Sequence, residues 1–378
     1  MSELEPVWQE WADRRPDAQV LHLDTAAAGR MSLDVRRAVS EHLRREAEVG
    51  AYVAEGEAAE LISTGRADVA ALLGVRTDGL AFVESGGSAL QSLLRAWPLP
   101  ADATVGVVAS EWGPNLQFFG WRGLRAVELA AEPDGRVDLD ALARLLASAP
   151  PSVVHLTQVA SHRGLVQPVA DAAALCRAAG VPLWVDAAQA LGHVDTATGA
   201  DAVYATSRKW LAGPRGVGML GVAERWWDRL VIEQPVMPPG ERPLVHWLDS
   251  HEANVAGRVG LSVAVHEFLT SGPVAVVERL AEVGRLTRAA LAELPGWTVV
   301  DGDAAGGAIT ALRPRNGCDA AETRARLLAE HAILTTASQV VRAPRELTEP
   351  LLRISPHVEC TEQSLSRLRD ALLSPGRR

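Results

Sequence analysis

The fold is decided by Thr206-Ser207-Arg208-Lys209-Trp210-Leu211-Ala212-Gly213-Pro214, read together with Val185-Asp186-Ala187-Ala188-Gln189. Each run follows a short apolar segment, Pro182–Val185 or Ala202–Ala205, of the kind that forms a buried strand. Ligands of open α/β sheets collect where such strands end, so we expect Asp186 and Lys209 to meet at one edge of a sheet. Burial would lower the pKa of Lys209 and favour its reaction with a carbonyl group.

The rest of the chain repeats this strand-then-helix pattern. Apolar runs such as Leu80–Val83 and Val153–Leu156 alternate with helical stretches rich in Ala, Leu and Arg, which predicts an α/β fold with a large, mainly parallel sheet. Gly257–Gly284 reads as one long amphipathic helix that joins two lobes. A chain of 378 residues exceeds what one core usually organises. We therefore expect an N-terminal segment (1–20) near the small domain, a large domain (21–255) and a smaller α+β domain (256–378).

Composition excludes several classes of function. A formal net charge of −10 disfavours nucleic acid as a partner, because binding phosphate backbones requires a basic surface. No apolar run is long enough to span a membrane, and Met1–Arg15 lacks the features of a secretory signal, so a cytoplasmic location is expected. The three cysteines, Cys176, Cys318 and Cys360, lie far apart and support neither disulfides nor a metal site.

The residues near Lys209 match the needs of pyridoxal phosphate (PLP). That cofactor requires a lysine amine for its aldehyde, a carboxylate for its ring nitrogen, a phosphate cradle and a flat partner for its ring. Asp186 could hold the ring nitrogen and Gln189 the phenolic oxygen. The turn Ser85-Gly86-Gly87-Ser88 precedes a predicted helix and could bind the phosphate through backbone amides, with Thr206 and Arg208 adding a hydroxyl and a positive charge.

Each of these residues also has a simpler interpretation. Asp186 alone is more often a helix N-cap, and a lone lysine is more often a solvated charge. A Ser-Gly-Gly-Ser turn commonly serves only tight geometry. The pairing of Asp186 with Lys209, 23 residues apart across one predicted strand, favours the cofactor site.

The two motifs Val185–His193 and Thr206–Gly218 resemble those of class V aminotransferase-like enzymes, the group that contains cysteine desulfurases, kynureninase and isopenicillin N epimerase-like proteins. Leu23–Ala27 and Leu352–His357 also match, so the resemblance covers almost the whole chain. It implies a fold-type-I PLP enzyme with a seven-stranded type of sheet, and a homodimer with active sites at the interface. It further implies that Lys209 binds the cofactor covalently and that Arg353 binds the substrate α-carboxylate.

The chain departs from the family pattern at several positions. The family's ring-stacking histidine falls in Glu111–Asn115, where Trp112 is the expected substitute, although a core tryptophan is the plain alternative. Arg208 stands where histidine is common, and Thr206 where serine is usual. The Gly-Thr-Pro motif of the family is missing before Asn254, so the resemblance gives no basis for a phosphate contact across the dimer.

The absence of a cysteine shortly before Arg353 limits the reactions that the chain could catalyse. A desulfurase needs a cysteine on a loop shortly before the carboxylate-binding arginine, and Thr335–Glu346 contains none. The remaining chemistry is removal of the Cα proton by Lys209 followed by β-elimination, as in a C–S lyase. An epimerase or aminotransferase, a desulfurase or selenocysteine lyase, and a catalytically silent binding protein are the alternatives, and the last predicts loss of Lys209 or Asp186.

Further runs resemble the actinobacterial hercynylcysteine sulfoxide lyases of ergothioneine biosynthesis: Glu48–Tyr52, Val159–Gly164, Ser207–Trp210 and Ala256–Gly260. The resemblance implies an S-(hercyn-2-yl)cysteine S-oxide substrate, whose trimethylammonium would favour an aromatic wall. Ala27 is expected to contact the substrate. Tyr52 would contact the substrate's cation, with Trp112 or Phe118 nearby, and His162 would lie near the leaving oxygen. Ordinary helix packing by Tyr52 and loop capping by His162 are the alternatives.

Overall fold

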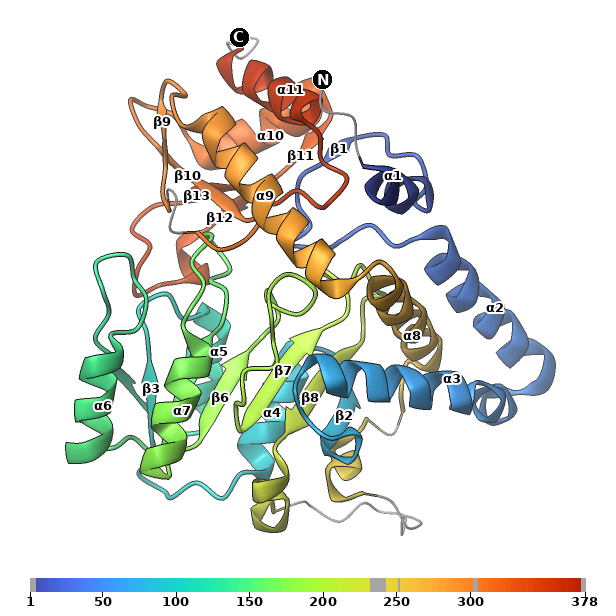
Figure 1. Cartoon of the computed structure of the whole chain (residues 1–378), viewed down its shortest axis with the longest axis vertical. Coiled ribbons are helices and arrows are strands. Elements are labelled where there is room, and N and C mark those ends of the chain that lie inside the picture. The colour runs from blue at the N-terminus through green and yellow to red at the C-terminus, as the bar shows by residue number, and fades with distance from the viewer. Residues whose placement is uncertain (1–4, 232–242, 251, 302–304, 375–378) are drawn as a thin grey trace.

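The computed structural model describes residues 5–231, 243–250, 252–301 and 305–374. These residues form a seven-stranded sheet, a four-stranded sheet and a two-stranded pair (Figure 1). The strands of the large sheet are β2 (Leu80–Val83), β3 (Thr104–Val107), β4 (Arg125–Glu128), β5 (Val153–Thr157), β6 (Leu183–Asp186), β7 (Ala202–Thr206) and β8 (Gly218–Val222). Helices of the same part of the chain are α2 (Leu33–Val49), α3 (Ala51–Leu72), α4 (Gly86–Ala96), α5 (Gly113–Trp121), α6 (Leu139–Ser148) and α7 (Val169–Ala179).

The large sheet confirms the expected α/β fold. Its strand order is β2-β8-β7-β6-β5-β3-β4, and β8 runs antiparallel to both neighbours while the other pairs are parallel. Most of its strands are buried along their whole length, as expected for a sheet covered on both faces. Parallel order brings the carboxyl ends of β5, β6 and β7 to one edge.

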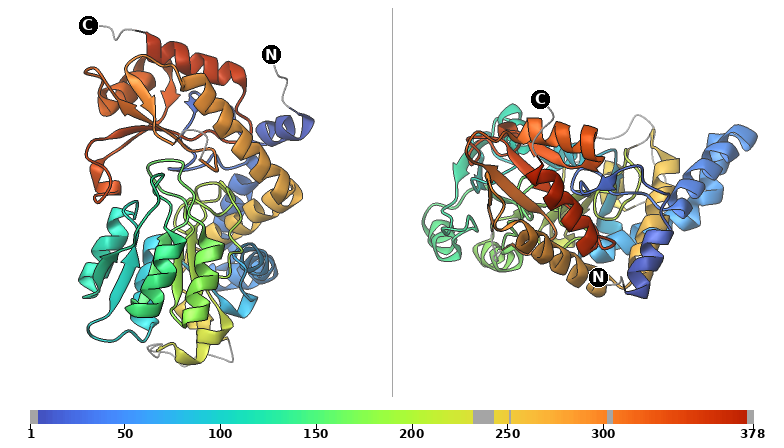
Figure 2. Two further views of the ribbon diagram at one scale, coloured as in Figure 1. Left: turned by 60° about the vertical axis from the view of Figure 1, so that its left-hand side comes forward. Right: turned by 90° about the horizontal axis from the view of Figure 1, so that it is seen from above.

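Alternate side chains of each strand enter two separate cores. Leu80 and Phe82 pack on the face covered by α3, α6, α7 and α8 (Val255–Thr270), whereas Ala81 and Val83 face α4 and α5. This alternation is the two-residue period of a strand. The left view in Figure 2 shows helices packed beside the strands of the large sheet.

The smaller sheet is antiparallel, with the order β12-β13-β10-β9, and it belongs to the expected smaller C-terminal part. Its strands are β9 (Trp297–Val299), β10 (Thr310–Pro314), β12 (Thr336–Ser338) and β13 (Leu351–Ile354), and its helices are α9 (Pro273–Leu291), α10 (Ala320–His331) and α11 (Glu362–Leu373). A parallel pair joins the N-terminal β1 (Leu21–His22) to β11 (Ile333–Leu334). The division of the chain at residues 20 and 255 stays a prediction.

The prediction of a single long helix over residues 257–284 is wrong. Two helices, α8 and α9, occupy this region and meet at an angle of 84°. The break lies at Gly272, which has a φ of 78°, and at Pro273, which has no amide hydrogen to continue the helical ladder. Proline at the first position of a helix is favourable, so the same residue that ends α8 begins α9.

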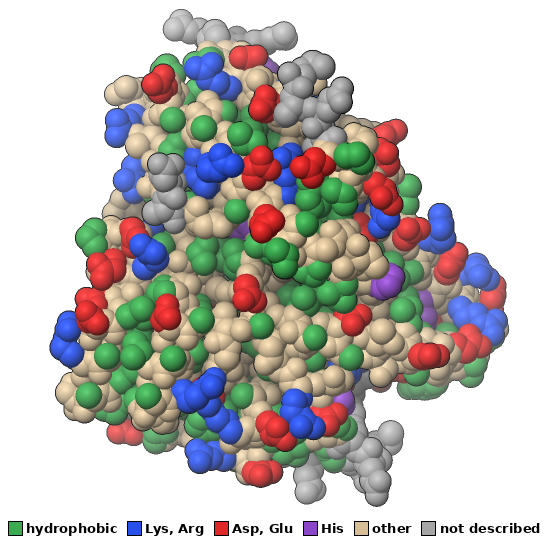
Figure 3. Space-filling view, in the orientation of Figure 1, with side chains coloured by type: hydrophobic (Ala, Val, Ile, Leu, Met, Phe, Trp, Pro, Cys, Tyr) green, Lys and Arg blue, Asp and Glu red, His purple; other side chains and the backbone are tan. Residues whose placement is uncertain are grey.

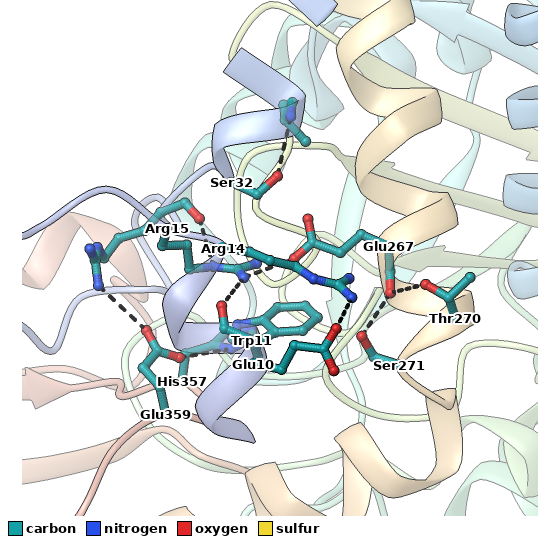
Figure 4. A network of polar contacts seen from close by, with 12 residues as sticks. Glu10, Trp11, Arg14, Arg15, Ser32, Glu267, Thr270, Ser271, His357 and Glu359 are labelled. Carbon is teal, nitrogen blue, oxygen red and sulfur yellow. Dashed lines mark hydrogen bonds and ion pairs between the residues drawn. The ribbon is translucent and has the colours of Figure 1, made fainter. Parts of the chain in front are cut away.

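The N-terminal helix α1 (Pro6–Asp13) fastens the two parts of the chain together (Figure 4). The Trp11 ring stacks on His357 at a centroid distance of 5.1 Å, and the Arg15 guanidinium lies 3.8 Å from the Trp11 ring centre. Arg15 also forms a 2.8 Å ion pair with Glu267 on α8. Because Trp11 and Arg15 are buried, this contact excludes water between α1, α8 and the segment after β13.

Acidic and basic side chains are interspersed on the molecular face seen in Figure 3. Among the described residues, no helix by itself is long and apolar enough to cross a membrane; α8 and α9 reach that length and composition only as a bent pair.

Candidate active site

A cavity of about 300 Å³ lies at the carboxyl ends of the parallel strands, where ligands of α/β sheets bind. Its wall comes from segments far apart in the sequence that follow β2, β5, β6 and β7, with further residues from α5 and η5 (Val340–Arg342). The lining residues are Ala26, Ala27, Ser85, Gly86, Gly87, Trp112, Pro114, Phe118, Thr157, Ser161, Asp186, Ala188, Gln189, Tyr204, Thr206, Arg208, Lys209 and Arg342.

Asp186 and Lys209 face the same cavity from adjacent strands. Asp186 is the last residue of β6, and its neighbour in the sheet register is Tyr204 on β7, the strand that leads to Lys209. Burial raises the pKa of Asp186, and the positive charge of Lys209 opposes that shift. Burial also lowers the pKa of Lys209 to about 7, and Arg208 acts in the same direction against the attraction of Asp186. Lys209 is the only lysine in the sequence.

Asn115 and the amide of Ala188 fix the carboxylate of Asp186. The Asn115 Nδ2 donates a 3.0 Å hydrogen bond to one oxygen, and the Ala188 amide donates a 2.9 Å bond to the other. Hydrogen bonds of this kind stabilise the charged carboxylate. Its orientation toward the cavity is therefore set before any ligand binds.

A polar network behind the cavity holds Asn115 in turn. The buried Glu111 accepts hydrogen bonds from Asn115 at 2.9 Å and Thr157 at 2.7 Å, and its other oxygen lies 2.8 Å from His155 Nδ1. His155 Nε2 lies 2.9 Å from the Tyr204 hydroxyl. Burial disfavours charge on Glu111, but His155 together with the hydrogen bonds from Thr157 and Asn115 holds the pKa of Glu111 below its ordinary value.

The sequence reasoning missed this network. The sequence feature that could have indicated the network is the pair His155 and Thr157, two polar residues on the same face of the otherwise apolar strand β5. Glu111 and Asn115 flank Trp112, whose expected stacking role drew attention away from them.

The start of α4 provides a site for an anion. Ser85 caps the helix, since its hydroxyl accepts a 3.0 Å hydrogen bond from the Ser88 amide. The Gly86 and Gly87 amides occupy the first two helical positions, which have no acceptor within a helix, and both glycines line the cavity. Thr206 and Arg208 approach the same cavity from the end of β7.

Gln189 is held at both ends of its amide. Its Nε2 donates a 2.8 Å hydrogen bond to the Ala26 carbonyl, and its Oε1 accepts a 3.0 Å bond from the indole of Trp210. Trp210 stacks on His193 at 3.8 Å, and its carbonyl lies 3.1 Å from His357 Nε2. This stack connects the residue after Lys209 to the contact made by α1.

Four of the predicted site residues lie away from the cavity surface in this chain. Ser88 uses its amide within the helix cap. Arg353 is fully buried, donating to the Ser161 carbonyl at 2.7 Å and to Asp24 at 2.9 Å. His162 is buried with its Nε2 3.3 Å from Glu346, and Tyr52, at the start of α3, is 83% exposed. Their assigned roles stay predictions.

The geometry fits PLP. A single lysine of lowered pKa, a fixed carboxylate, free helix-start amides and the flat ring of Trp112 line one cavity of suitable size. These are the groups that the cofactor requires.

Comparisons with known proteins show the family of this chain. The family model described as aminotransferase class-V matches residues 21–368. A probable hercynylcysteine sulfoxide lyase of Mycobacterium tuberculosis (strain CDC 1551 / Oshkosh) is 47% identical over 367 residues, covering 96% of this chain and 92% of that protein. A cysteine desulfurase of Enterobacter sp. (strain 638) is 27% identical over 318 residues, 76% of each chain.

Among solved structures, the apo cysteine desulfurase of Thermococcus onnurineus NA1 matches with a TM-score of 0.84 at 17% identity, over 98% of each chain. That likeness shows the fold. The family match covers most of the chain and includes both cavity motifs. The chain therefore belongs to the aminotransferase class-V family and is a pyridoxal-phosphate-dependent enzyme.

Proposed function

We propose that this chain is a carbon–sulfur lyase that splits S-(hercyn-2-yl)-L-cysteine S-oxide by β-elimination in ergothioneine biosynthesis. The observation that carries the proposal is the 47% identity, over 96% of the chain, to a probable hercynylcysteine sulfoxide lyase. The products are a sulfenic acid, pyruvate and ammonia.

The cysteines support elimination over desulfuration. Cys176 and Cys360 are buried, and burial raises the pKa of each thiol to about 12, which disfavours the reactive thiolate. Cys318 lies between β10 and α10 along the chain and is not among the residues that line the cavity. The segment after β12 brings Arg342, rather than a thiol, to the cavity.

In this proposal different residues bind different parts of PLP. Lys209 binds it covalently, Asp186 holds the ring nitrogen, and Gln189 holds the phenolic oxygen. The phosphate is held by Gly86 and Gly87, with Thr206, Arg208 and Ser88 contributing around them, and Trp112 covers the ring. Bound PLP supplies an electron sink that stabilises negative charge at the substrate Cα.

The same residues account for the elimination. Once the substrate amine has taken its place on the cofactor, the released neutral amine of Lys209 would take the Cα proton, and its lowered pKa favours the neutral form near pH 7. The Cβ–S bond then breaks, and its electron pair leaves on the sulfenate, which takes up a proton. The remaining aminoacrylate hydrolyses to pyruvate and ammonia. Ala27 and Arg353 are the proposed substrate-binding residues, and His162 is the proposed group near the leaving oxygen. A cytoplasmic location stays a prediction.

Pyruvate release tests the proposed reaction. We expect the purified chain to convert S-(hercyn-2-yl)-L-cysteine S-oxide to pyruvate and ammonia in equal amounts, and Lys209→Ala to release none. Reduction with borohydride should attach the cofactor to Lys209 alone, since the sequence has no other lysine. Racemisation or transamination of the substrate without pyruvate would instead support the epimerase or aminotransferase alternative, and release of alanine the desulfurase.

The lowered pKa of Lys209 predicts the pH dependence of cofactor attachment. Only the neutral amine attacks an aldehyde, so the rate should rise about tenfold per pH unit below the pKa and level off above it. With a pKa of about 7, against 10.5 for an ordinary lysine, the plateau should begin near pH 7 to 8. Stopped-flow mixing of apoprotein with PLP measures this rate. A rate that still increases through pH 9 would contradict the lowered pKa.

Loss of the Asn115 hydrogen bond should weaken cofactor binding. Hydrogen bonds to charged groups contribute about 1.5–3 kcal/mol, so Asn115→Leu should raise the dissociation constant for PLP roughly 10- to 150-fold. Titration of the apoprotein, followed by absorbance, gives this constant. Gln117→Leu, an exposed position on the same helix, is the matched control and should leave it unchanged. Equal constants for both variants would show that Asp186 does not need Asn115.

A homodimer with shared active sites is also part of the proposal. The α2–α3 hairpin projects from the body of the chain (Figures 1 and 2) and exposes apolar side chains, including Leu43, Val53 and Leu61. Exposed apolar patches of this kind mark protein interfaces. Tyr52, at the tip of the hairpin, would reach the cavity of a second copy and contact the substrate cation there.

Subunit complementation tests this arrangement. Tyr52→Ala should lower activity, and co-expression of Tyr52→Ala with Lys209→Ala should restore roughly a quarter of the sites, because half of a random mixture is heterodimer with one intact site. Sedimentation should give twice the mass of one chain. Unaltered activity of Tyr52→Ala, or a monomer in sedimentation, would contradict the shared site.

A further inference from the structure

Arg342 is a cation on the cavity wall whose role the sequence did not suggest. It is the last residue of η5 and one of the lining residues, and it is half-buried. Within the described part of the chain, its guanidinium has no hydrogen bond or ion pair. Burial and then the positive charge of Arg353 lower its pKa to about 10, so the site disfavours its charge while leaving it ionised at neutral pH.

Behind this side of the cavity, the guanidinium of Arg353 already has two protein partners. Arg353 donates to Asp24 and to the Ser161 carbonyl, and it is fully buried. The Thr336 hydroxyl lies 2.8 Å from each oxygen of Asp24, so its single hydrogen is shared between the two. The carboxylate nearest to this arginine pair is therefore satisfied by Arg353 and Thr336, and Arg342 is left facing the cavity.

The segment that carries Arg342 is fixed on three sides. Ala343 and Leu347 insert into a small core with Ala311 and Leu351. The carbonyl of Val341 lies so close to Gly113 that any side chain at that glycine would collide with it, which places η5 against the start of α5.

Glu346 provides the third attachment. Its Oε1 lies 2.6 Å from Arg163 Nε and 3.3 Å from His162 Nε2, both on the loop after β5. Arg163 is held in turn by Asp301 at 2.6 Å. Burial opposes the charge on Glu346, but His162 and Arg163 outweigh it and keep its pKa below the ordinary value. The ion pairs thus tie the segment to the large sheet beside Ser161, another residue of the cavity wall.

We infer that Arg342 binds an oxyanion of the amino-acid substrate, and that Glu346 is the positioning residue that holds it in place. Because the backbone that carries Arg342 is fixed in advance, its planar guanidinium binds a carboxylate or an S-oxide oxygen at the cavity wall without a prior movement of the segment. The S-oxide is one candidate partner and rests on the proposed function, since the electron pair of the broken Cβ–S bond leaves on that S–O group. The α-carboxylate is present in every amino-acid substrate.

Two measurements on the holoenzyme distinguish the S-oxide from the α-carboxylate as the oxyanion that Arg342 binds. The first is kcat/KM for pyruvate release from S-(hercyn-2-yl)-L-cysteine S-oxide. The second is the dissociation constant of L-alanine, which carries the carboxylate and no S–O group, from the change in cofactor absorbance. Arg342→Met is the main variant. Arg345→Met, at an exposed position on the same segment, is the matched control and should behave as wild type.

We expect Arg342→Met to lower kcat/KM about 10- to 100-fold, the range for losing a charge-assisted hydrogen bond. Weaker L-alanine binding by the same factor would assign the α-carboxylate, and unchanged L-alanine binding would assign the S-oxide. Wild-type values in both assays would overturn the inference. A wild-type enzyme that releases no pyruvate would refute the proposed function, while L-alanine binding would still test Arg342 for the carboxylate.

A double-mutant cycle tests Glu346. Glu346→Gln should raise KM, or the L-alanine dissociation constant. If Glu346 acts through Arg342, the double variant Arg342→Met/Glu346→Gln should bind no more weakly than Arg342→Met alone. Additive losses would show that Glu346 acts on the site without Arg342 and would overturn the positioning role.

Discussion

The structure depends on keeping two opposite charges buried at the end of adjacent strands. Burying the charge of Asp186 or of Lys209 costs free energy, and the opposite charge of the other residue lowers that cost. The register of β6 and β7 brings them to one cavity, and Asn115 fixes the direction of the carboxylate. The order of the seven strands, with parallel β5, β6 and β7 ending together, is what makes this arrangement available to a ligand.

Support for that pair extends well beyond the cavity. The Glu111, His155 and Tyr204 network lies on one side of the sheet edge, and the Gln189, Trp210 and His193 contacts lie on the other. Through His357 the second set reaches Trp11 on α1, so the first helix of the chain and the loop carrying Lys209 share one stack of rings. Residues distant in sequence therefore limit the movement of the lysine.

The sequence predicted the parts of the molecule in which local pattern and motif agree. Such patterns account for the strands that end at Asp186 and lead to Lys209, and for the glycines at the start of α4. They also account for the cavity position of Trp112, Thr206 and Arg208. The bend at Gly272 and Pro273 was missed because apolar residues continue across it on both sides. Glu111, Asn115 and Arg342 were missed because their importance arises from long-range contacts, which one sequence does not reveal.

The single lysine has a consequence for how the protein meets reactive small molecules. Its surface cations are arginines, whose guanidinium groups stay protonated and react poorly with aldehydes and active esters. Sugars, acylating metabolites and amine-directed labels therefore find one side-chain amine in the whole chain, and it lies inside the cavity. Glycation or acylation at that position would inactivate the enzyme, and a bound cofactor would shield the chain from both.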